Sequence, residues 1–167
     1  MVKKAGFGGG CHWCTEAVFM ALKGVQSVQQ GWIASDEGNN SFSEAVIVEY
    51  DPEVIGFDTL IAVHLYTHGS TSQHSMRGKY RSAVYTFQDE DSTEAKAAIA
   101  RLQLEFEHPI ITQVLSFADF KMSRYELLNY YFSDTQKPFC ENYINPKLKL
   151  LMKKFAAVTR VDKLRHL

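Results

Sequence analysis

The prediction of the fold starts from the segment KKAGFGGGCHWCTEAVFMALKG, residues 3–24. Residues 3–7 predict a short strand that leads into three consecutive glycines, residues 8–10. A helix is expected to begin near Cys11, because apolar side chains then recur at helical spacing until Gly24 supplies a C-terminal stop. The segment therefore predicts a strand, a tight glycine loop and a helix in direct succession.

Beyond this segment, short strands and helices intermingle without the regular spacing of a doubly wound fold. Strands are predicted at residues 25–34, 45–50, 81–87 and 113–117, and helices at 58–67, 93–107, 125–132 and 146–155. Asp58 is a plausible N-cap for the first of these helices. We expect an α+β fold: a single domain with a mixed or antiparallel sheet, helices packed on it and a ferredoxin-like core. A basic, helical C-terminal extension is expected from about residue 146.

The composition is that of an ordinary globular protein, with 46% hydrophobic and 22% charged residues in a chain of 167. A formal net charge of -1 gives no field that would select nucleic acid. The chain shows neither the apolar core of a signal peptide nor an apolar run of the ~20 residues that cross a bilayer. We therefore expect a cytoplasmic protein that binds neither nucleic acid nor membrane. The basic side chains of the C-terminal stretch are interpreted as a solvated helix face: Lys147, Lys149, Lys153, Lys154, Arg160, Lys163 and Arg165.

The chain has three cysteines, an odd number that argues against a disulfide framework. In a reducing compartment, cysteines are more often catalytic, redox-active or metal-binding than structural. Cys11 stands out because it follows the glycines at the predicted helix N-terminus. There the unpaired amides and the partial positive charge favour a thiolate, which is the nucleophilic form. Cys11 is therefore predicted to be reactive.

Cys14 lies three residues after Cys11, near one helical turn away. Residues at this spacing can come within the Cα separation that a disulfide needs. Cys14 would then trap an oxidised Cys11. The alternative is that Cys14 is a small buried residue on the core side of the helix, and the sequence leaves both open.

A zinc site is a second interpretation of the cysteine pair, with His64 and His68 as the remaining ligands. The two pairs are much farther apart in sequence than in a zinc finger, and the cysteines fall in the first turn of an amphipathic helix. The glycine cluster lacks the lysine of a phosphate-binding loop. We therefore expect neither a metal nor a cofactor.

Residues 9–19, GGCHWCTEAVF, resemble the active-site segment of the A-type peptide methionine sulfoxide reductases, which usually reads Gly-Cys-Phe-Trp. The resemblance continues at residues 22–25, 31–32, 43–52, 68 and 80–85, and loosely at 139–143. It implies that residues 1–167 form one methionine sulfoxide reductase A-like domain. The implied reaction is reduction of the S epimer of methionine sulfoxide, free or in proteins, with thioredoxin as the reductant.

The resemblance also implies the roles of individual residues. Cys11 would attack the sulfoxide sulfur, and Glu44 would be the acid, buried and kept protonated by desolvation. Cys11 would become a sulfenic acid, which Cys14 or Cys140 would resolve as a disulfide for thioredoxin to reduce. Cys140 follows Pro138-Phe139 in an expected loop, where mobility would help it to reach Cys11.

The substrate pocket follows from the same resemblance. Trp13 would supply an aromatic wall for the methyl thioether, and Tyr80 would donate a hydrogen bond to the sulfoxide oxygen. The sequence departs from the family at His12, which replaces a phenylalanine, and at Trp32, which replaces a tyrosine.

A third departure is that residues 74–79 hold no carboxylate where the family has an aspartate. His74 and Ser75 are the expected substitutes. The departures at Trp32 and near Ser75 motivate an alternative function, a non-catalytic or redox-sensing relative.

Overall fold

The structure is a computed structural model that describes residues 1–36 and 38–167. Its strands are β1 (Lys3–Gly8), β2 (Val25–Ala34), β3 (Ser43–Tyr50), β4 (Ala83–Thr86), β5 (Gln113–Ser116) and β6 (Asp119–Met122). Its α-helices are α1 (His12–Met20), α2 (Phe57–Thr67), α3 (Asp89–Leu102), α4 (Tyr130–Ser133) and α5 (Asn145–Lys154). Short 3-10 turns and a π-helical turn, Cys140–Ile144, lie between them.

Within the described residues, six strands form a sheet in the order β5-β4-β1-β3-β2-β6. Neighbouring strands are antiparallel, except that β4 and β5 are parallel. The expected α+β class with a mixed sheet is therefore confirmed. The ferredoxin-like core stays a prediction; the structure shows the succession β1-α1-β2-β3-α2-β4 with β4-β1-β3-β2 at the centre of the sheet.

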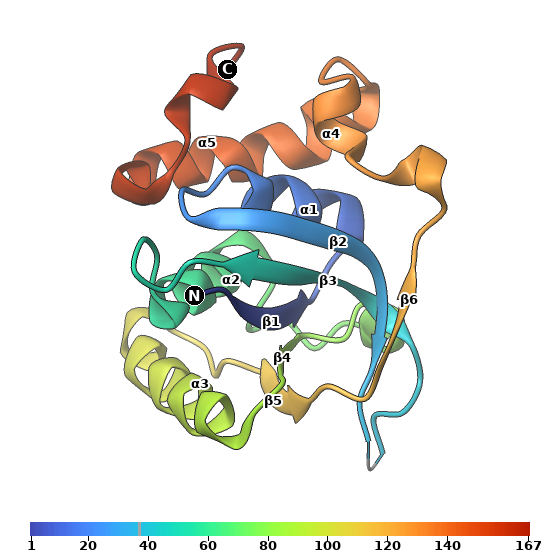
Figure 1. Cartoon of the computed structure of the whole chain (residues 1–167), viewed down its shortest axis with the longest axis vertical. Coiled ribbons are helices and arrows are strands. Elements are labelled where there is room, and N and C mark those ends of the chain that lie inside the picture. The colour runs from blue at the N-terminus through green and yellow to red at the C-terminus, as the bar shows by residue number, and fades with distance from the viewer. Residues whose placement is uncertain (37) are drawn as a thin grey trace.

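The larger hydrophobic core lies between the helices and one face of the sheet. The alternation along β3 places Val46, Val48 and Tyr50 in this core, and all three are essentially unexposed. A smaller cluster occupies the other face, because the intervening residues Ala45 and Ile47 point away from the helices. In Figure 1, α1 lies above β2, and α3 lies at the lower left beside β4 and β5.

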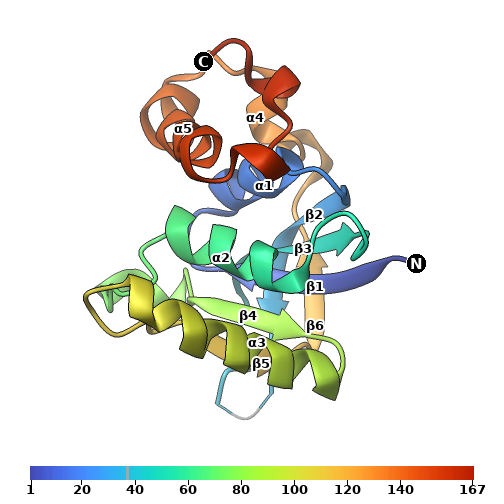
Figure 2. The same ribbon diagram turned by 90° about the vertical axis from the view of Figure 1, so that its left-hand side faces the viewer.

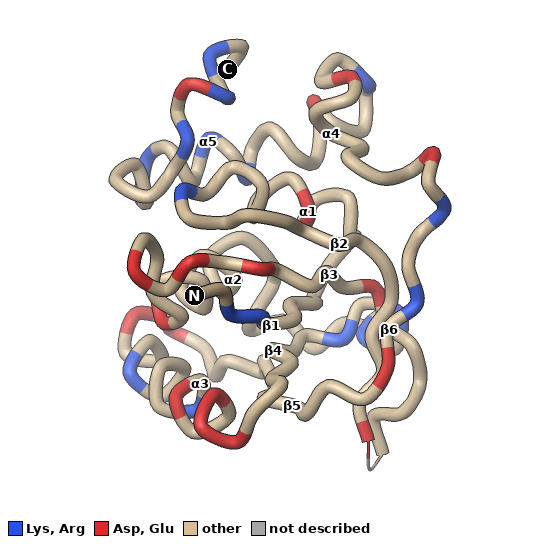
Figure 3. Tube along the Cα trace, in the orientation of Figure 1, with Lys and Arg blue, Asp and Glu red and all other residues tan. Residues whose placement is uncertain are grey.

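The C-terminal segment covers α1 from the side opposite the sheet, as Figures 1 and 2 show for α4 and α5. Leu148 and Leu151 on α5 are fully buried. Figure 3 shows lysine and arginine along α5, and Lys149 is exposed as expected for a solvated face. That interpretation is wrong for Lys147, which turns inward and donates a hydrogen bond to the carbonyl of Thr67.

Two predicted helix starts are wrong. The N-cap of α2 is Gly56, and Asp58 lies inside the first turn. Helix α3 begins at Asp89 rather than at 93, because three acidic residues fit the first turn of a helix, where the dipole favours negative charge. Strand β6 was not predicted. Among the helices of residues 1–36 and 38–167, none has the length and apolar character of a bilayer span.

Candidate active site

The glycine loop between β1 and α1 is held in a conformation that positions Cys11. Gly9 has a φ of 152°, and a Cβ at this position would collide with the ring of His68. Arg77 donates hydrogen bonds to the carbonyl oxygens of Gly9 at 2.7 Å and Tyr80 at 2.8 Å. The buried guanidinium therefore joins the glycine loop to the loop before β4, a role that the sequence did not reveal.

Cys11 is the N-cap of α1, as the glycine loop and helix start predicted. The pKa of its thiol is lowered, first by a hydrogen bond from the Cys14 thiol and then by the N–H groups of Trp13 and Cys14. Burial and the nearby Glu44 act in the opposite direction. The donors at the helix N-terminus outweigh these two effects, so the thiolate is favoured.

Cys14 is the partner of that thiolate. It is 7% exposed and lies on the core side of α1. The hydrogen bond from its thiol to Cys11 is the largest cause of a strongly raised Cys14 pKa, and burial acts in the same direction. This hydrogen bond therefore favours the thiolate on Cys11 and the thiol on Cys14.

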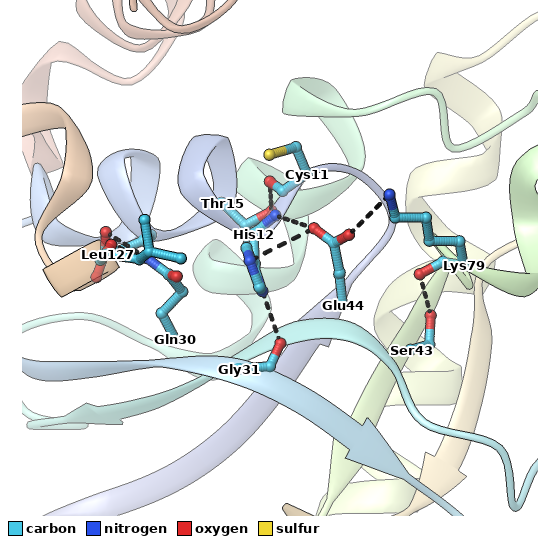
Figure 4. Close-up of polar contacts among 10 residues, drawn as sticks. Cys11, His12, Thr15, Gln30, Gly31, Ser43, Glu44, Lys79 and Leu127 are labelled. Carbon is cyan, nitrogen blue, oxygen red and sulfur yellow. Dashed lines mark hydrogen bonds and ion pairs between the residues drawn. The ribbon is translucent and has the colours of Figure 1, made fainter. Parts of the chain in front are cut away.

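Glu44 reaches the same place from the sheet. It is directly opposite Trp32 in the β2–β3 ladder, so both side chains project from the helix-covered face. Its carboxylate accepts a hydrogen bond from the backbone N–H of His12 at 3.2 Å, and Lys79 Nζ lies 3.6 Å away. Figure 4 shows Glu44 between His12 and Lys79, with Cys11 next to His12 at the start of α1. Glu44 is 6% exposed.

The ring of His12 packs between α1 and the sheet. Its Nδ1 donates to the carbonyl of Gly31 at 2.8 Å, since a carbonyl only accepts. Its Nε2 then faces the Glu44 carboxylate at 3.6 Å. Trp32 packs against His12 edge to face, with ring centroids 5.0 Å apart. The residue that replaces the family's phenylalanine therefore contacts the predicted acid.

Trp13 belongs to an aromatic cluster on the other side of α1. Its ring stacks on Tyr130 with centroids 4.1 Å apart, and Phe139 meets it edge-on at 5.4 Å. Tyr130 is held there because the carboxylate of Glu16 accepts hydrogen bonds from the N–H groups of Asn129 and Tyr130. The sequence did not reveal Tyr130, which comes from a segment more than 100 residues away.

Hydrogen bonds to the backbone of Lys79 hold Lys79 and Tyr80 near Glu44. The carbonyl of Lys79 accepts hydrogen bonds from the N–H of Glu44 at 3.0 Å and from the hydroxyl of Ser43 at 2.9 Å. The Lys79 ammonium lies over the Tyr80 ring, 5.1 Å from its centroid. Lys79, exposed and beside Glu44, was also missed by the sequence analysis.

His74 and Ser75 lie apart from the side chains around Cys11 and Glu44. Both are exposed at the start of the 3-10 turn Ser75–Gly78. His74 Nδ1 accepts the N–H of Met76 and so caps this turn. Within the part of the chain that the structure describes, no side-chain hydrogen bond joins either residue to Cys11 or Glu44.

Cys140 is not in a mobile loop, so that expectation is wrong. It is 0% exposed and begins the π-helical turn that runs into α5. Its thiol donates to the carbonyl of Asp134 at 3.6 Å, and burial raises its pKa. The turn packs against α1, which explains why Cys140 is enclosed rather than free.

The two histidines considered as zinc ligands have other partners. His64 Nε2 donates to the carbonyl of Gly8 at 2.7 Å, and His68 Nε2 contacts the hydroxyl of Ser82 at 2.8 Å. Burial lowers the pKa of His64 to about 4, and lowers that of His68 as well. Residues 1–36 and 38–167 contain no group of three or more His, Cys, Asp or Glu side chains placed to hold a metal ion.

Comparison with known proteins gives the same family as the residues of the site. The family described as "Peptide methionine sulfoxide reductase" matches residues 3–159. The peptide methionine sulfoxide reductase MsrA of Erwinia tasmaniensis is 34% identical over 166 residues, which cover 90% of this chain and 93% of the relative. The MsrA of Chromobacterium violaceum is 32% identical, covering 93% and 97%.

Solved structures share the fold. Mxr1 from Saccharomyces cerevisiae in reduced form has a TM-score of 0.74 at 21% identity, covering 85% of this chain and 91% of that chain. Mxr1 in complex with Trx2 has a TM-score of 0.61 at 21% identity, covering 77% and 84%. From these matches and the geometry of the Cys11 site, the chain belongs to the peptide methionine sulfoxide reductase family.

Proposed function

We propose that this protein reduces methionine S-sulfoxide, free or in proteins, to methionine, with Cys11 as the nucleophile. One observation carries the proposal: the Cys11 thiol has a lowered pKa at the N-terminus of α1, with a buried carboxylate and a second thiol beside it. Membership of the family supplies the substrate class. Residues 1–167 act as one methionine sulfoxide reductase A-like domain in this proposal.

In the first step the Cys11 thiolate attacks the sulfoxide sulfur and forms an S–S bond, while the sulfoxide oxygen takes up a proton. The oxygen then moves to Cys11: a Cys11 S–O bond forms as the substrate S–O bond and the S–S bond break, which leaves a sulfenic acid on Cys11 and releases methionine. The oxygen must gain one proton in this step, and Glu44 is the proposed donor. His12 and Lys79 both lie beside the Glu44 carboxylate and orient it, and the Lys79 ammonium is placed to return a proton to it.

The proposed substrate contacts come from both sides of Cys11. Trp13, backed by Tyr130, offers aromatic surface to the thioether, for which sulfur–aromatic contacts are favourable. Trp32 and Tyr80 flank Glu44 and are the proposed donors to the sulfoxide oxygen. We propose that His74 and Ser75 support the loop that carries Tyr80 and do not contact the substrate.

In the second step a thiol displaces the hydroxyl of the sulfenic acid and forms a disulfide. We propose Cys14 for this role, because it lies one helical turn from Cys11, lines the same cavity and is the largest influence on the Cys11 pKa. Cys140 lies behind Cys14 and is the second candidate. Thioredoxin then reduces the disulfide, which requires a reducing compartment such as the cytoplasm. The Mxr1 structure with Trx2 is the related complex.

Turnover of separate sulfoxide epimers tests this function. The purified wild type is mixed with dithiothreitol and the S or the R epimer of a methionine sulfoxide peptide, and methionine is quantified. We expect turnover of the S epimer alone, and none with Cys11→Ser. Absence of turnover in the folded wild type would instead support a non-catalytic or redox-sensing relative.

A further inference from the structure

A small enclosed cavity lies behind the two cysteines, at the meeting of α1, α2 and α5. Its volume is about 40 Å³, enough for a water molecule. Figure 2 shows α5 above α1, with α2 below them. The cavity brings Lys147, from the C-terminal segment, into one lining with both thiols: Gly9, Gly10, Cys11, Cys14, Thr15, Val18, His64, Thr67, His68 and Lys147.

Lys147 is fixed in this lining by the end of α2. Its ammonium donates a hydrogen bond to the carbonyl of Thr67, the last residue of that helix. The C-terminus of a helix carries a partial negative charge and favours a cation. Burial lowers the Lys147 pKa, while the two cysteines raise it. The cavity therefore has a helix N-terminus with a thiolate on one side and a helix C-terminus with an ammonium on another.

The other titratable groups around Cys14 do not supply positive charge. Burial holds His64 and His68 neutral by lowering their pKa values. Cys140 and Tyr130 lie near Cys14 and have raised pKa values, so both are uncharged.

Two further charged groups lie farther from Cys14. Arg77 does not line the cavity, and it directs its donors to the carbonyls of Ser72, Gly69, Gly9 and Tyr80. Glu44 is on the other side of Cys11, against His12 and Lys79. Among the described residues that line the cavity, Lys147 is thus the source of positive charge.

We propose that Lys147 promotes ionisation of Cys14 after Cys11 has been oxidised, and so drives closure of the Cys11–Cys14 disulfide. The inference rests on the proposed function for the identity of the natural oxidant. Lys147 is a positioning residue in this scheme, since it acts through the Cys14 sulfur.

The Cys14 sulfur attacks the Cys11 sulfur, the S–S bond forms and the S–O bond of the sulfenic acid breaks. The Cys14 sulfur is oxidised and the Cys11 sulfur is reduced. The proton lost by Cys14 joins the departing hydroxide, and water leaves.

The order of the two steps follows from which charge faces Cys14. In the reduced protein the Cys14 thiol donates a hydrogen bond to the Cys11 thiolate, so Cys14 keeps its proton and does not compete for substrate. Once Cys11 carries a hydroxyl, that negative charge is gone. Lys147 remains and lowers the Cys14 pKa, so Cys14 becomes a nucleophile only when there is a sulfenic acid to resolve.

The test oxidises Cys11 with hydrogen peroxide, so that it does not depend on sulfoxide reduction. The full-length reduced protein receives one equivalent of peroxide, and samples are quenched over time. Trapping of the sulfenic acid with dimedone and peptide mapping give the rate of disulfide closure at pH 6 to 9. The variants are Lys147→Met, which keeps the apolar stem, Lys147→Gln, which keeps a donor for Thr67, and Lys147→Arg, which keeps the charge. Lys149→Met on the exposed face of α5 is the matched control.

We expect closure at pH 7 to slow at least about tenfold in the Met and Gln variants, because one unit of thiol pKa changes the thiolate fraction tenfold. Dimedone-labelled Cys11 should accumulate, and raising the pH should restore closure. Lys147→Arg and Lys149→Met should close like the wild type. Closure at the wild-type rate and pH dependence in a folded Met or Gln variant overturns the proposal, as does slow closure in Lys149→Met. Loss of sulfoxide turnover with intact peroxide-driven closure would count against the proposed function instead.

Discussion

At the residue scale, the chemistry depends on which donors surround the Cys11 sulfur. The Cys14 thiol is the largest cause of the lowered Cys11 pKa. Cys14→Ala removes that donor, so the Cys11 thiolate fraction at neutral pH should fall and the midpoint of the pH dependence of Cys11 alkylation should rise. Cys14→Ser keeps a hydroxyl donor and should shift the midpoint less. Identical alkylation profiles for the wild type and Cys14→Ala would show that the helix amides alone stabilise the thiolate.

Glu44 is tested at the same scale. Glu44→Gln keeps the shape of the side chain but cannot donate an acidic proton to the sulfoxide oxygen. We expect methionine formation in a single turnover to slow by roughly 10²–10⁴, the usual contribution of a positioned acid. Cys11 should remain open to iodoacetamide. Equal single-turnover rates for variant and wild type would remove Glu44 from the acid role.

Residues predicted from the sequence are those whose signals are local. Three glycines before Cys11 indicate a helix start and a reactive thiol without reference to any distant segment. No such signal marks Lys147, Arg77 or Tyr130, since each reaches the site from another part of the chain through a hydrogen bond between a side chain and the backbone. Lys147 was interpreted as part of a solvated face because it stands in a run of basic residues.

At the scale of elements, the connection from β1 to α1 sets the position of Cys11. Gly9→Ala places a Cβ against the His68 ring at a φ that L-residues rarely adopt. We expect the variant to lower the free energy of unfolding by about 1–3 kcal/mol and to slow Cys11 alkylation. Gly10→Ala is the matched control, because a Cβ there meets nothing within 4 Å. Denaturation in urea measures the free energy of unfolding of the two variants. Equal stability of Gly9→Ala and Gly10→Ala would contradict this account of the loop.

The strands were predicted best where side chains alternate, as they do along β3. Strand β6 was not predicted because it is a short edge strand with charged residues and shows no strand pattern in its sequence. It is a strand because its backbone pairs with β2. Helix α4 is shorter than predicted, since Asn129 adopts a left-handed conformation with a φ of 54° just before it. The carboxylate of Glu16 fixes that turn, a contact between distant segments.

At the scale of the whole molecule, the buried histidines make stability depend on pH. His64 is neutral in the folded state with a pKa of about 4, against about 6.5 when unfolded. The unfolded chain therefore binds more protons between these values, so stability falls as the pH drops from 6.5 to 4. The full contribution of His64 is roughly 3 kcal/mol. Urea denaturation between pH 7.5 and 4 should show a smaller loss for His64→Gln, whose amide can still donate to Gly8. Equal slopes would contradict a neutral buried His64.

The whole molecule also explains why the active site could not be assembled from sequence alone. The α+β class follows from the pattern of strands and helices, but the C-terminal segment returns over α1, where Cys14 and Cys140 are buried. That packing buries Cys140, which the sequence placed in a mobile loop, and turns Lys147 inward.

The central claim is tested most directly by a single turnover with one equivalent of methionine S-sulfoxide, followed by acid quench and peptide mapping of the wild type. The account predicts one equivalent of methionine and a disulfide between Cys11 and Cys14, with Cys140 still a free thiol. Methionine formed without any change at Cys11, or a folded protein that forms no methionine, would contradict it.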